Sequence, residues 1–241
     1  MPDQPNIAST AFLIAEPARA SMLMALADGR ALPAGELAYA AGVTAQTAST
    51  HLAKLLAGGL LAVETEGRHR YYRLSGPQVA QVLENLAAIH PVDEVRRKPL
   101  SPEARNLRFA RCCYDHLAGQ VGVAVTQALQ KHGFIVAAAD KLFEVTPAGI
   151  AWFRSVGLDV NALHASRSTR RGVARQCLDW TEREHHLGGP LGVQLMSALC
   201  SHGWMRRTKT SRVVQVTPQG WDALKEQLGI EGRLGTLSHE H

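Results

Sequence analysis

Between Glu36 and Leu61, the spacing of apolar and polar residues predicts two short helices. Alanine and leucine dominate the first, and Gly42 follows it where a helix can end in a left-handed turn, which costs glycine nothing. Thr44 can cap the second helix through its hydroxyl. One face of the second helix is apolar, with residues at i, i+4 and i+7: Ala48, Leu52 and Leu55. The pattern predicts a helix, a tight turn and a second helix that buries this stripe.

The opposite face of the second helix is short, polar and almost uncharged. An ordinary surface helix usually carries Glu and Lys pairs there, whereas a helix that enters the major groove needs small donor and acceptor groups that reach base edges. This face and its margins hold Gln46, Thr47, Ser49, Thr50, His51 and Lys54. We interpret the helix as a recognition helix. A plain helical hairpin in an all-α domain is the alternative that these residues by themselves leave open.

A β-hairpin is predicted directly after this helix. Two short β runs, Leu60 to Val63 and Tyr71 to Leu74, flank a polar loop that contains a glycine. A hairpin in this position is the wing of a winged helix. Its basic tip consists of Arg68, His69 and Arg70, which are placed to meet phosphates or the adjacent minor groove.

Residues 14–74 resemble the ArsR/SmtB family of winged helix-turn-helix repressors in the order of their motifs. Glu16-Pro17-Ala18-Arg19 stands where that family has an Asp-Pro-x-Arg helix start, and Ser49-Thr50-His51-Leu52 stands where it has a Ser-x-His-Leu core. Gly67-Arg68 with Tyr71-Tyr72 is similar to the turn of its wing. The resemblance implies a winged helix that binds DNA, and it leaves the signal open.

Helices before and after the motif complete the predicted DNA-binding domain. A first helix is expected in Asn6 to Ala15 and a second from Pro17 to Leu26. After the wing, a helix from Gln78 to Ile89 carries an apolar stripe made of Val79, Val82, Leu83, Leu86 and Ile89. In the resembled family the first and last helices form a two-fold dimer, which implies a homodimer here. Packing of the stripe on its own domain or on the C-terminal half is the alternative.

Composition limits the class of protein. The chain has 241 residues, more than one domain usually contains, and 46% of them are hydrophobic. No apolar run reaches the ~18–20 residues of a membrane span and no signal peptide is evident, so we expect a cytoplasmic protein without a membrane partner. Four cysteines, two of them adjacent, do not resemble a disulfide framework. The net charge of +5 suits an acidic partner, but residues 1–98 are balanced in charge, so the evidence for DNA binding is the helix and wing.

The chain is expected to divide into an N-terminal domain and a C-terminal half. Residues 1–91 form the winged-helix domain, and residues 92–104, with consecutive basic residues and two prolines, form a linker. An internal repeat follows, with one copy in residues 105–160 and the other in residues 161–241. Each copy is expected to contain a helix, a glycine turn, a helix, a β-hairpin and a helix, which resembles a winged helix. The predicted fold class is mainly α with small β-hairpin wings (α+β).

Matching residues mark the two copies. The aligned pairs include Cys113 and Cys177, Asp115 and Asp179, His116 and His186, and the helix starts Thr146-Pro147 and Thr217-Pro218. A cleft between two similar units is a natural ligand site. We therefore expect the two copies to form one effector or dimerisation domain, residues 105–241.

Cysteine and histidine residues near the start of each copy suggest several kinds of site. The candidates for an effector or thiol site are Cys112, Cys113, His116, Cys177, His185 and His186. Cys113 lies at helical spacing from Phe109 and Leu117, which favours a buried core cysteine. A thiol or metal sensor is the second interpretation, and a catalytic cysteine is the third. The metal-binding patterns of the resembled family are missing, so neither a metal nor a cofactor is expected.

These observations predict a DNA-binding transcriptional regulator, most simply a homodimeric repressor that an effector releases from its operator. Gln46, Thr47, Ser49 and Thr50 would contact base edges, and Thr44 and Lys54 would contact phosphates. An unidentified small molecule would bind the C-terminal half and favour the DNA-free state. One alternative is a regulator that senses thiol state or a metal through Cys112, Cys113 and Cys177. The other is an enzyme activity in the C-terminal half, but the sequence has no nucleophile elbow, phosphate loop or paired metal motif, so we expect no enzyme.

Overall fold

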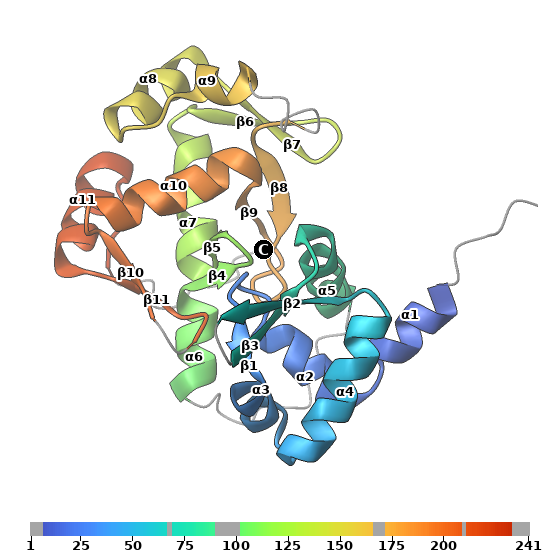
Figure 1. The fold of residues 1–241 in the computed structure, drawn as a ribbon. Helices are drawn as coiled ribbons and strands as arrows, with labels where there is room; N and C mark the ends of the chain where they lie inside the picture. The colour runs from blue at the N-terminus through green and yellow to red at the C-terminus, as the bar shows by residue number, and fades with distance from the viewer. Residues whose placement is uncertain (1–6, 67–68, 90–101, 166–171, 209–210, 233–241) are drawn as a thin grey trace, which may run out of the picture. The chain divides into compact units, whose positions relative to one another are not determined.

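The chain forms two compact units, Met1–Leu86 and Ala87–His241 (Figure 1). The computed structural model describes residues 7–66, 69–89, 102–165, 172–208 and 211–232. The boundary lies shortly before residue 91, where the N-terminal domain was expected to end. Within the described residues, no helix combines the length and the apolar character that crossing a bilayer requires.

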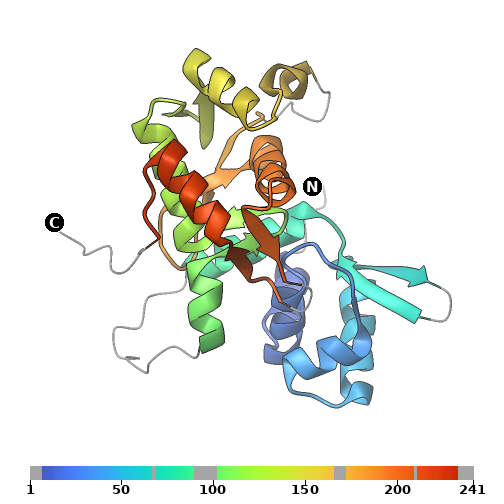
Figure 2. The ribbon, with the colours of Figure 1, turned by 90° about the vertical axis from the view of Figure 1, so that its left-hand side faces the viewer.

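Unit 1 has the elements of a winged helix. In chain order they are α1 (Ile7–Ile14), α2 (Pro17–Ala25), β1 (Leu32–Pro33), α3 (Ala34–Ala41), α4 (Ala45–Ala57), β2 (Leu61–Glu66), β3 (His69–Leu74) and α5 (Pro77–Ile89), whose last three residues lie beyond the boundary. The strands form an antiparallel sheet in the order β1-β3-β2. Figure 2 shows the β2-β3 hairpin extending away from the helices of this unit, as a wing does. The predicted winged helix-turn-helix is confirmed.

The turn between α3 and α4 forms for the reasons that the sequence suggested. Gly42 ends α3 in the left-handed region, with φ of 64°. Thr44 caps α4, because its Oγ1 accepts a hydrogen bond from the backbone N–H of Thr47 at 3.2 Å. The stripe of Ala48, Leu52 and Leu55 is buried against the rest of unit 1. The orientation of α4 therefore follows from its own apolar face.

The Glu-Pro-Ala-Arg motif joins α1 to α2. The Glu16 carboxylate accepts hydrogen bonds from the backbone N–H groups of Ala18 (3.2 Å) and Arg19 (2.9 Å) and so caps α2. The buried Arg19 guanidinium donates to the carbonyls of Leu13 and Phe12 at the end of α1. One tetrapeptide thus satisfies free backbone groups of both helices.

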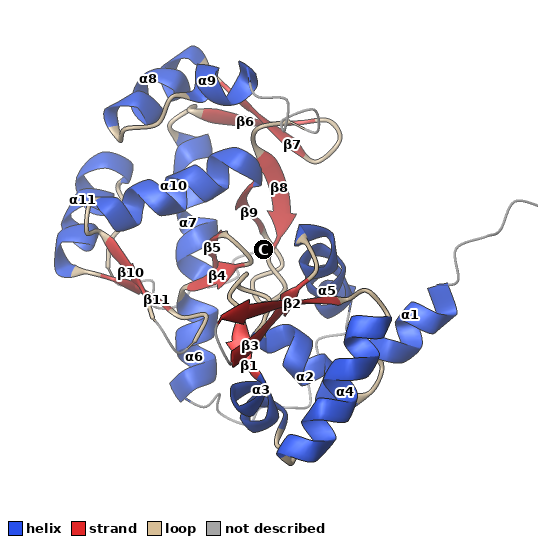
Figure 3. Cartoon of the chain, in the orientation of Figure 1, coloured by secondary structure: helices blue, strands red, loops and turns tan. Residues whose placement is uncertain are grey.

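Unit 2 alternates β-hairpins with helices, as Figure 3 shows. Its elements are α6 (Pro102–Phe109), β4 (Arg111–Cys113), β5 (His116–Ala118), α7 (Gly119–Lys131), β6 (Ile135–Ala138), β7 (Leu142–Val145), α8 (Pro147–Ser155), α9 (Val160–Ala165), β8 (Arg175–Leu178), β9 (His185–Gly188), α10 (Gly189–Ser201), β10 (Met205–Arg207), β11 (Val214–Val216) and α11 (Pro218–Leu228). The order hairpin, helix, hairpin, helix occurs twice, from β4 to α8 and from β8 to α11. Helix α6 begins inside the stretch 92–104 that was expected to be a linker.

The helix expected around Cys113 was wrong, because this stretch is a hairpin. Residues Arg111–Cys113 and His116–Ala118 pair antiparallel, and Arg175–Leu178 and His185–Gly188 do so in the second half. The i, i+4, i+8 spacing of Phe109, Cys113 and Leu117 had favoured a helix. Strands of three or four residues are too short to show a clear alternation, so periodicity cannot exclude the helix.

The later helices of unit 2 begin as predicted. Thr146 and Thr217 cap α8 and α11, each accepting a hydrogen bond at 3.0 Å from the N–H three residues on, that of Gly149 or Gly220. These two glycines also allow close packing, since an added Cβ would lie 1.9 or 2.0 Å from the carbonyl oxygen of Phe134 or Trp204. Helices α7 and α10 contribute several of their side chains to the core of the unit.

Candidate functional site

The outer face of α4 is exposed, as expected for a recognition helix. Its exposed polar residues are Gln46, Thr47, Ser49, Thr50 and Lys54. The Oγ1 atoms of Thr44 and Thr47 lie 2.9 Å apart, and the Thr50 hydroxyl donates to the carbonyl of Gln46 at 3.3 Å. These bonds hold the hydroxyls close to the helix surface, and each hydroxyl can still make a second hydrogen bond to a partner. The face offers short polar groups on a rigid support.

His51 differs from the other residues predicted on this face. Its side chain is only 14% exposed, and its Nδ1 lies 3.6 Å from Oε2 of Glu16. The pKa of Glu16 is lowered, mainly because its carboxylate accepts the backbone N–H of Arg19. Glu16 and His51 thus lie side by side where α4 packs against the start of α2. The structure places His51 mostly buried beside Glu16 and not on the exposed polar face.

The wing presents basic side chains near its tip. In the register of β2 and β3, Thr65 pairs with Arg70 and Glu66 pairs with His69, and both basic residues are exposed. The Arg70 guanidinium lies 5.8 Å from the ring centroid of Tyr72. Arg73, further from the tip, forms an ion pair with Glu64. Arg68 lies outside the described residues.

Unit 1 exposes large apolar side chains on its first and last helices. On α1, Ile7 is 76% and Phe12 is 73% exposed, and on α5, Val82 is 46% and Leu86 is 47% exposed. Of the predicted stripe on α5, Leu83 alone falls below 5% exposure. Several exposed apolar side chains of this size on two helices suit a contact surface.

Unit 2 brings together four of the six cysteine and histidine candidates. Cys113 and His116 come from the β4-β5 hairpin, and Cys177 and His186 come from the β8-β9 hairpin. All four are buried, and their Sγ and ring nitrogen atoms lie within 4.8 Å of one another. We call these four residues the Cys-His cluster. Cys112 contacts Arg207 instead, with Nη2 at 3.0 Å from its Sγ, and His185 is not a member.

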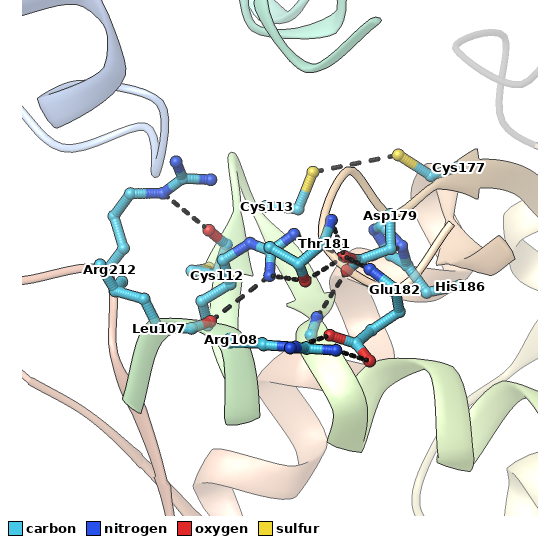
Figure 4. A network of polar contacts seen from close by, with 12 residues as sticks. Leu107, Arg108, Cys112, Cys113, Cys177, Asp179, Thr181, Glu182, His186 and Arg212 are labelled. Carbon is cyan, nitrogen blue, oxygen red and sulfur yellow. Dashed lines mark hydrogen bonds and ion pairs between the residues drawn. The ribbon is translucent and has the colours of Figure 1, made fainter. Parts of the chain in front are cut away.

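Charged groups lie directly beside the Cys-His cluster (Figure 4). The Asp179 carboxylate accepts hydrogen bonds from Arg111 Nη2 (2.8 Å), from the N–H of Gly119 (2.7 Å) and from Thr181. Its Oδ2 also lies 3.7 Å from Nδ1 of His186. Burial is the largest influence and opposes ionisation of Asp179, but its charged and hydrogen-bonded partners, led by the Arg111 guanidinium, together outweigh burial and lower the pKa. This buried pair joins Arg111 of the first half of unit 2 to Asp179 of the second half.

The cluster does not have the properties of a thiol nucleophile. The hydrogen bond with Cys177, together with burial, raises the pKa of the Cys113 thiol to about 12. A catalytic or redox-sensing cysteine needs a lowered pKa and access to solvent. This environment argues against the catalytic interpretation of Cys113.

The sequence singled out the four residues that the structure brings together, without showing how they meet. Aligning the two copies matched Cys113 with Cys177 and His116 with His186, yet the expected helix concealed the cross-strand pairs. Arg111 and its pairing with Asp179 were missed, because no local pattern links residues 68 positions apart.

Comparisons with known proteins place these features in context. A family model described as a helix-turn-helix domain matches residues 14–64. An uncharacterised HTH-type transcriptional regulator of Bacillus subtilis, YdfF, is 43% identical over 227 residues, which cover 94% of this chain and 99% of that protein. The HTH-type transcriptional regulator CmtR of Mycobacterium tuberculosis is 37% identical over 76 residues, 32% of this chain and 64% of CmtR. The solved structure titled as the cadmium metal-sensor CMTR of the same organism is 30% identical, covers 39% of this chain and 98% of its own, and has a TM-score of 0.31.

Proposed function

The chain belongs to the winged helix-turn-helix transcriptional regulators of the ArsR type, and from this premise we propose that it is a homodimeric repressor that an effector releases from operator DNA. The observation that carries the proposal is the outer face of α4, which is exposed, polar and rigidly braced. A wing with exposed basic residues follows this helix directly. In this arrangement a helix contacts base edges in the major groove while a hairpin contacts the DNA backbone.

Within this proposal the residues have separate tasks. Gln46, Thr47, Ser49 and Thr50 contact base edges, because their donors and acceptors can distinguish base pairs. Thr44 and Lys54 contact phosphates, and Arg68, His69 and Arg70 contact the backbone or the minor groove beside it. His51 positions α4 through Glu16 instead of contacting DNA.

The dimer contact uses the first and last helices of unit 1. Ile7 and Phe12 on α1 and Val82 and Leu86 on α5 are exposed, and burying them against a second copy would remove apolar surface from water. A two-fold dimer presents two α4 helices to two half-sites about one helical turn of DNA apart.

The effector acts through unit 2. This unit has its own hydrophobic core, separate from that of unit 1, and we propose that its two runs of hairpin, helix, hairpin, helix are two copies of one winged-helix-like repeat. A small molecule can release the operator only if it binds the DNA-free state more tightly than the DNA-bound state. A compound screen against the selected operator complex identifies such a molecule.

The experiment that tests the DNA-binding proposal starts with selection from random duplexes. Binding of the selected site is then measured by fluorescence anisotropy at several salt concentrations. We expect Arg70→Ala to weaken binding to all sequences and to reduce the slope of log K against log salt by about one unit. Gln46→Ala should instead cost about 1–3 kcal/mol at particular base pairs and relax preference there.

Arg73→Ala is the matched control, because this arginine of the same strand is already paired with Glu64. It should leave the salt slope close to that of the wild type. Equal effects of Arg70→Ala and Arg73→Ala, or selection of no preferred sequence, would count against the assignment of α4 and the wing.

A further inference from the structure

We propose that Cys113, His116, Cys177 and His186 bind one Zn²⁺ ion in a closed, four-coordinate site inside unit 2. The inference goes beyond the proposed function and does not depend on it, since it concerns a unit other than the DNA-binding one. Two sulfur and two imidazole ligands in a tetrahedral arrangement are a donor set that Zn²⁺ prefers.

Each hairpin supplies one cysteine and one histidine from directly opposite positions. Cys113 on β4 is the cross-strand partner of His116 on β5, and Cys177 on β8 is the partner of His186 on β9. Opposite residues of an antiparallel pair project from the same face of the hairpin, with Cβ atoms about 4.5–5.5 Å apart. Each hairpin therefore provides two ligands from one face, and the cluster forms where the two hairpins meet.

The separations within like pairs match a tetrahedral zinc site. Cys113 Sγ and Cys177 Sγ are 3.9 Å apart, and His116 Nε2 and His186 Nε2 are 3.1 Å apart. Bond lengths of about 2.3 Å to sulfur and 2.0–2.1 Å to nitrogen place tetrahedral ligands roughly 3.8 Å (S to S) and 3.3 Å (N to N) apart. The longest separation in the cluster is no more than 4.8 Å, so metal binding needs only a modest approach of the sulfur pair to the nitrogen pair.

A carboxylate lies beside Nδ1 of each imidazole, and the two Nε2 atoms face each other. Nδ1 of His116 lies 2.9 Å from a carboxylate oxygen of Asp115 and so carries the proton. Nδ1 of His186 faces Asp179 at 3.7 Å, and a proton there is again favoured by the carboxylate. Both Nε2 lone pairs then point at each other across 3.1 Å in a buried site, which is unfavourable unless a cation lies between them. Histidine ligands of zinc typically have such a carboxylate at the second nitrogen.

A metal ion would bind all four side chains at once, whereas a proton shared between the imidazoles would satisfy only the two nitrogens. The thiols would then keep no more than the weak hydrogen bond between their sulfur atoms, which are 3.9 Å apart. A disulfide would explain the sulfurs, but the Sγ atoms are 3.9 Å apart in place of about 2.05 Å. On binding Zn²⁺ the two thiols release their protons to solvent, and the two thiolates balance the charge of the ion.

The closed coordination assigns a structural role to the site. All four ligands come from the protein and are buried, so no position is left for a substrate or an activated water. The ion joins hairpins that lie more than 60 residues apart along the chain and thereby links the two halves of unit 2. Gly188 makes room for this approach, since an added Cβ would lie 3.1 Å from Nε2 of His116.

The first test measures metal in the full-length protein, purified under reducing conditions without a histidine tag. Elemental analysis should find about one zinc per chain. Protein stripped with a chelator and titrated with Co²⁺ should show the intense visible bands of tetrahedral cobalt and a thiolate charge-transfer band, saturating at one equivalent. These spectra are read on the wild-type chain and so require no variant to fold.

Variants locate the site. Cys113→Ser/Cys177→Ser and His186→Gln should lose the zinc and the thiolate band or shift its spectrum. Cys200→Ser and His185→Gln are matched controls, because they remove the same atom types outside the cluster, and they should retain one zinc per chain. Circular dichroism checks that each variant remains folded.

Zinc well below one equivalent in the wild type, together with Co²⁺ spectra that lack a thiolate band, would overturn the proposal. So would cluster variants that are folded and hold as much zinc as the two controls. Because no arm of the test measures DNA binding, its failure is distinguishable from failure of the repressor proposal.

Discussion

Breaking the buried ion pair between Arg111 and Asp179 is expected to destabilise unit 2 strongly. The two side chains are 1% and 0% exposed, and Nη2 of Arg111 lies 2.8 Å from Oδ1 of Asp179. Asp179→Ala leaves the guanidinium buried with only Leu107 O and Thr181 Oγ1 as acceptors. Removing one partner of a buried pair typically costs about 3–5 kcal/mol, because the other charge stays buried without compensation.

The two single substitutions should not be equal. After Arg111→Met the Asp179 carboxylate still accepts from the N–H groups of Gly119, Thr181 and Glu182 and from the Thr181 hydroxyl. We therefore expect Arg111→Met to cost less than Asp179→Ala. The double variant should cost no more than Asp179→Ala, which gives a coupling energy of roughly 2–3 kcal/mol.

Urea unfolding followed by tryptophan fluorescence measures this effect in unit 2. The four tryptophans, Trp152, Trp180, Trp204 and Trp221, all lie in this unit, so the signal does not report on unit 1. Saturating Zn²⁺ keeps occupancy of the proposed metal site equal between variants, since Asp179 also faces His186. Additive single effects, with a coupling energy below about 0.5 kcal/mol, would refute the reasoning, because independent sites add within that margin.

Three other predictions concern the caps, the dimer and the acid side of the stability profile. Thr217→Ala should lower the free energy of unfolding of unit 2 by about 1 kcal/mol, because it removes the cap of α11. The same fluorescence assay measures this change. Ser201→Ala, at an exposed position, should change the free energy of unfolding by less than about 0.5 kcal/mol. Val82→Glu should convert the dimer to a monomer, measured by sedimentation velocity, and should weaken operator binding. Gln81→Glu on the same helix should do neither. A dimeric Val82→Glu protein would show that α5 is not at the dimer contact. In an NMR titration, Glu16 should show a pKa below its ordinary value of 4.5. The stability that Glu16 contributes is therefore complete above its pKa in the unfolded chain and is lost as pH falls through its pKa in the folded protein. Glu16→Gln should remove this part of the pH dependence, and a normal pKa for Glu16 would contradict the cap.

The sequence by itself determined the DNA-binding unit. Helix α4 is long enough for its apolar stripe to repeat, and Gly42 and Thr44 mark the turn between α3 and α4. These signals act between neighbours in the chain, so local spacing is sufficient to read them. The same holds for the starts of α8 and α11, where threonine and proline stand next to each other.

Only the tertiary structure decided where the cysteines and histidines of unit 2 lie. The β4-β5 hairpin turns at Tyr114 and Asp115 without a glycine, and Tyr114 adopts a φ of 53°, so the sequence carries no ordinary turn signal there. The same residue types therefore fitted a helix equally well. His116 and His186 meet across 70 positions of chain, and so do Arg111 and Asp179 across 68, because packing of two hairpins brings them together. Contacts of this range arise from the fold of the whole unit, and no pattern of neighbouring residues encodes them.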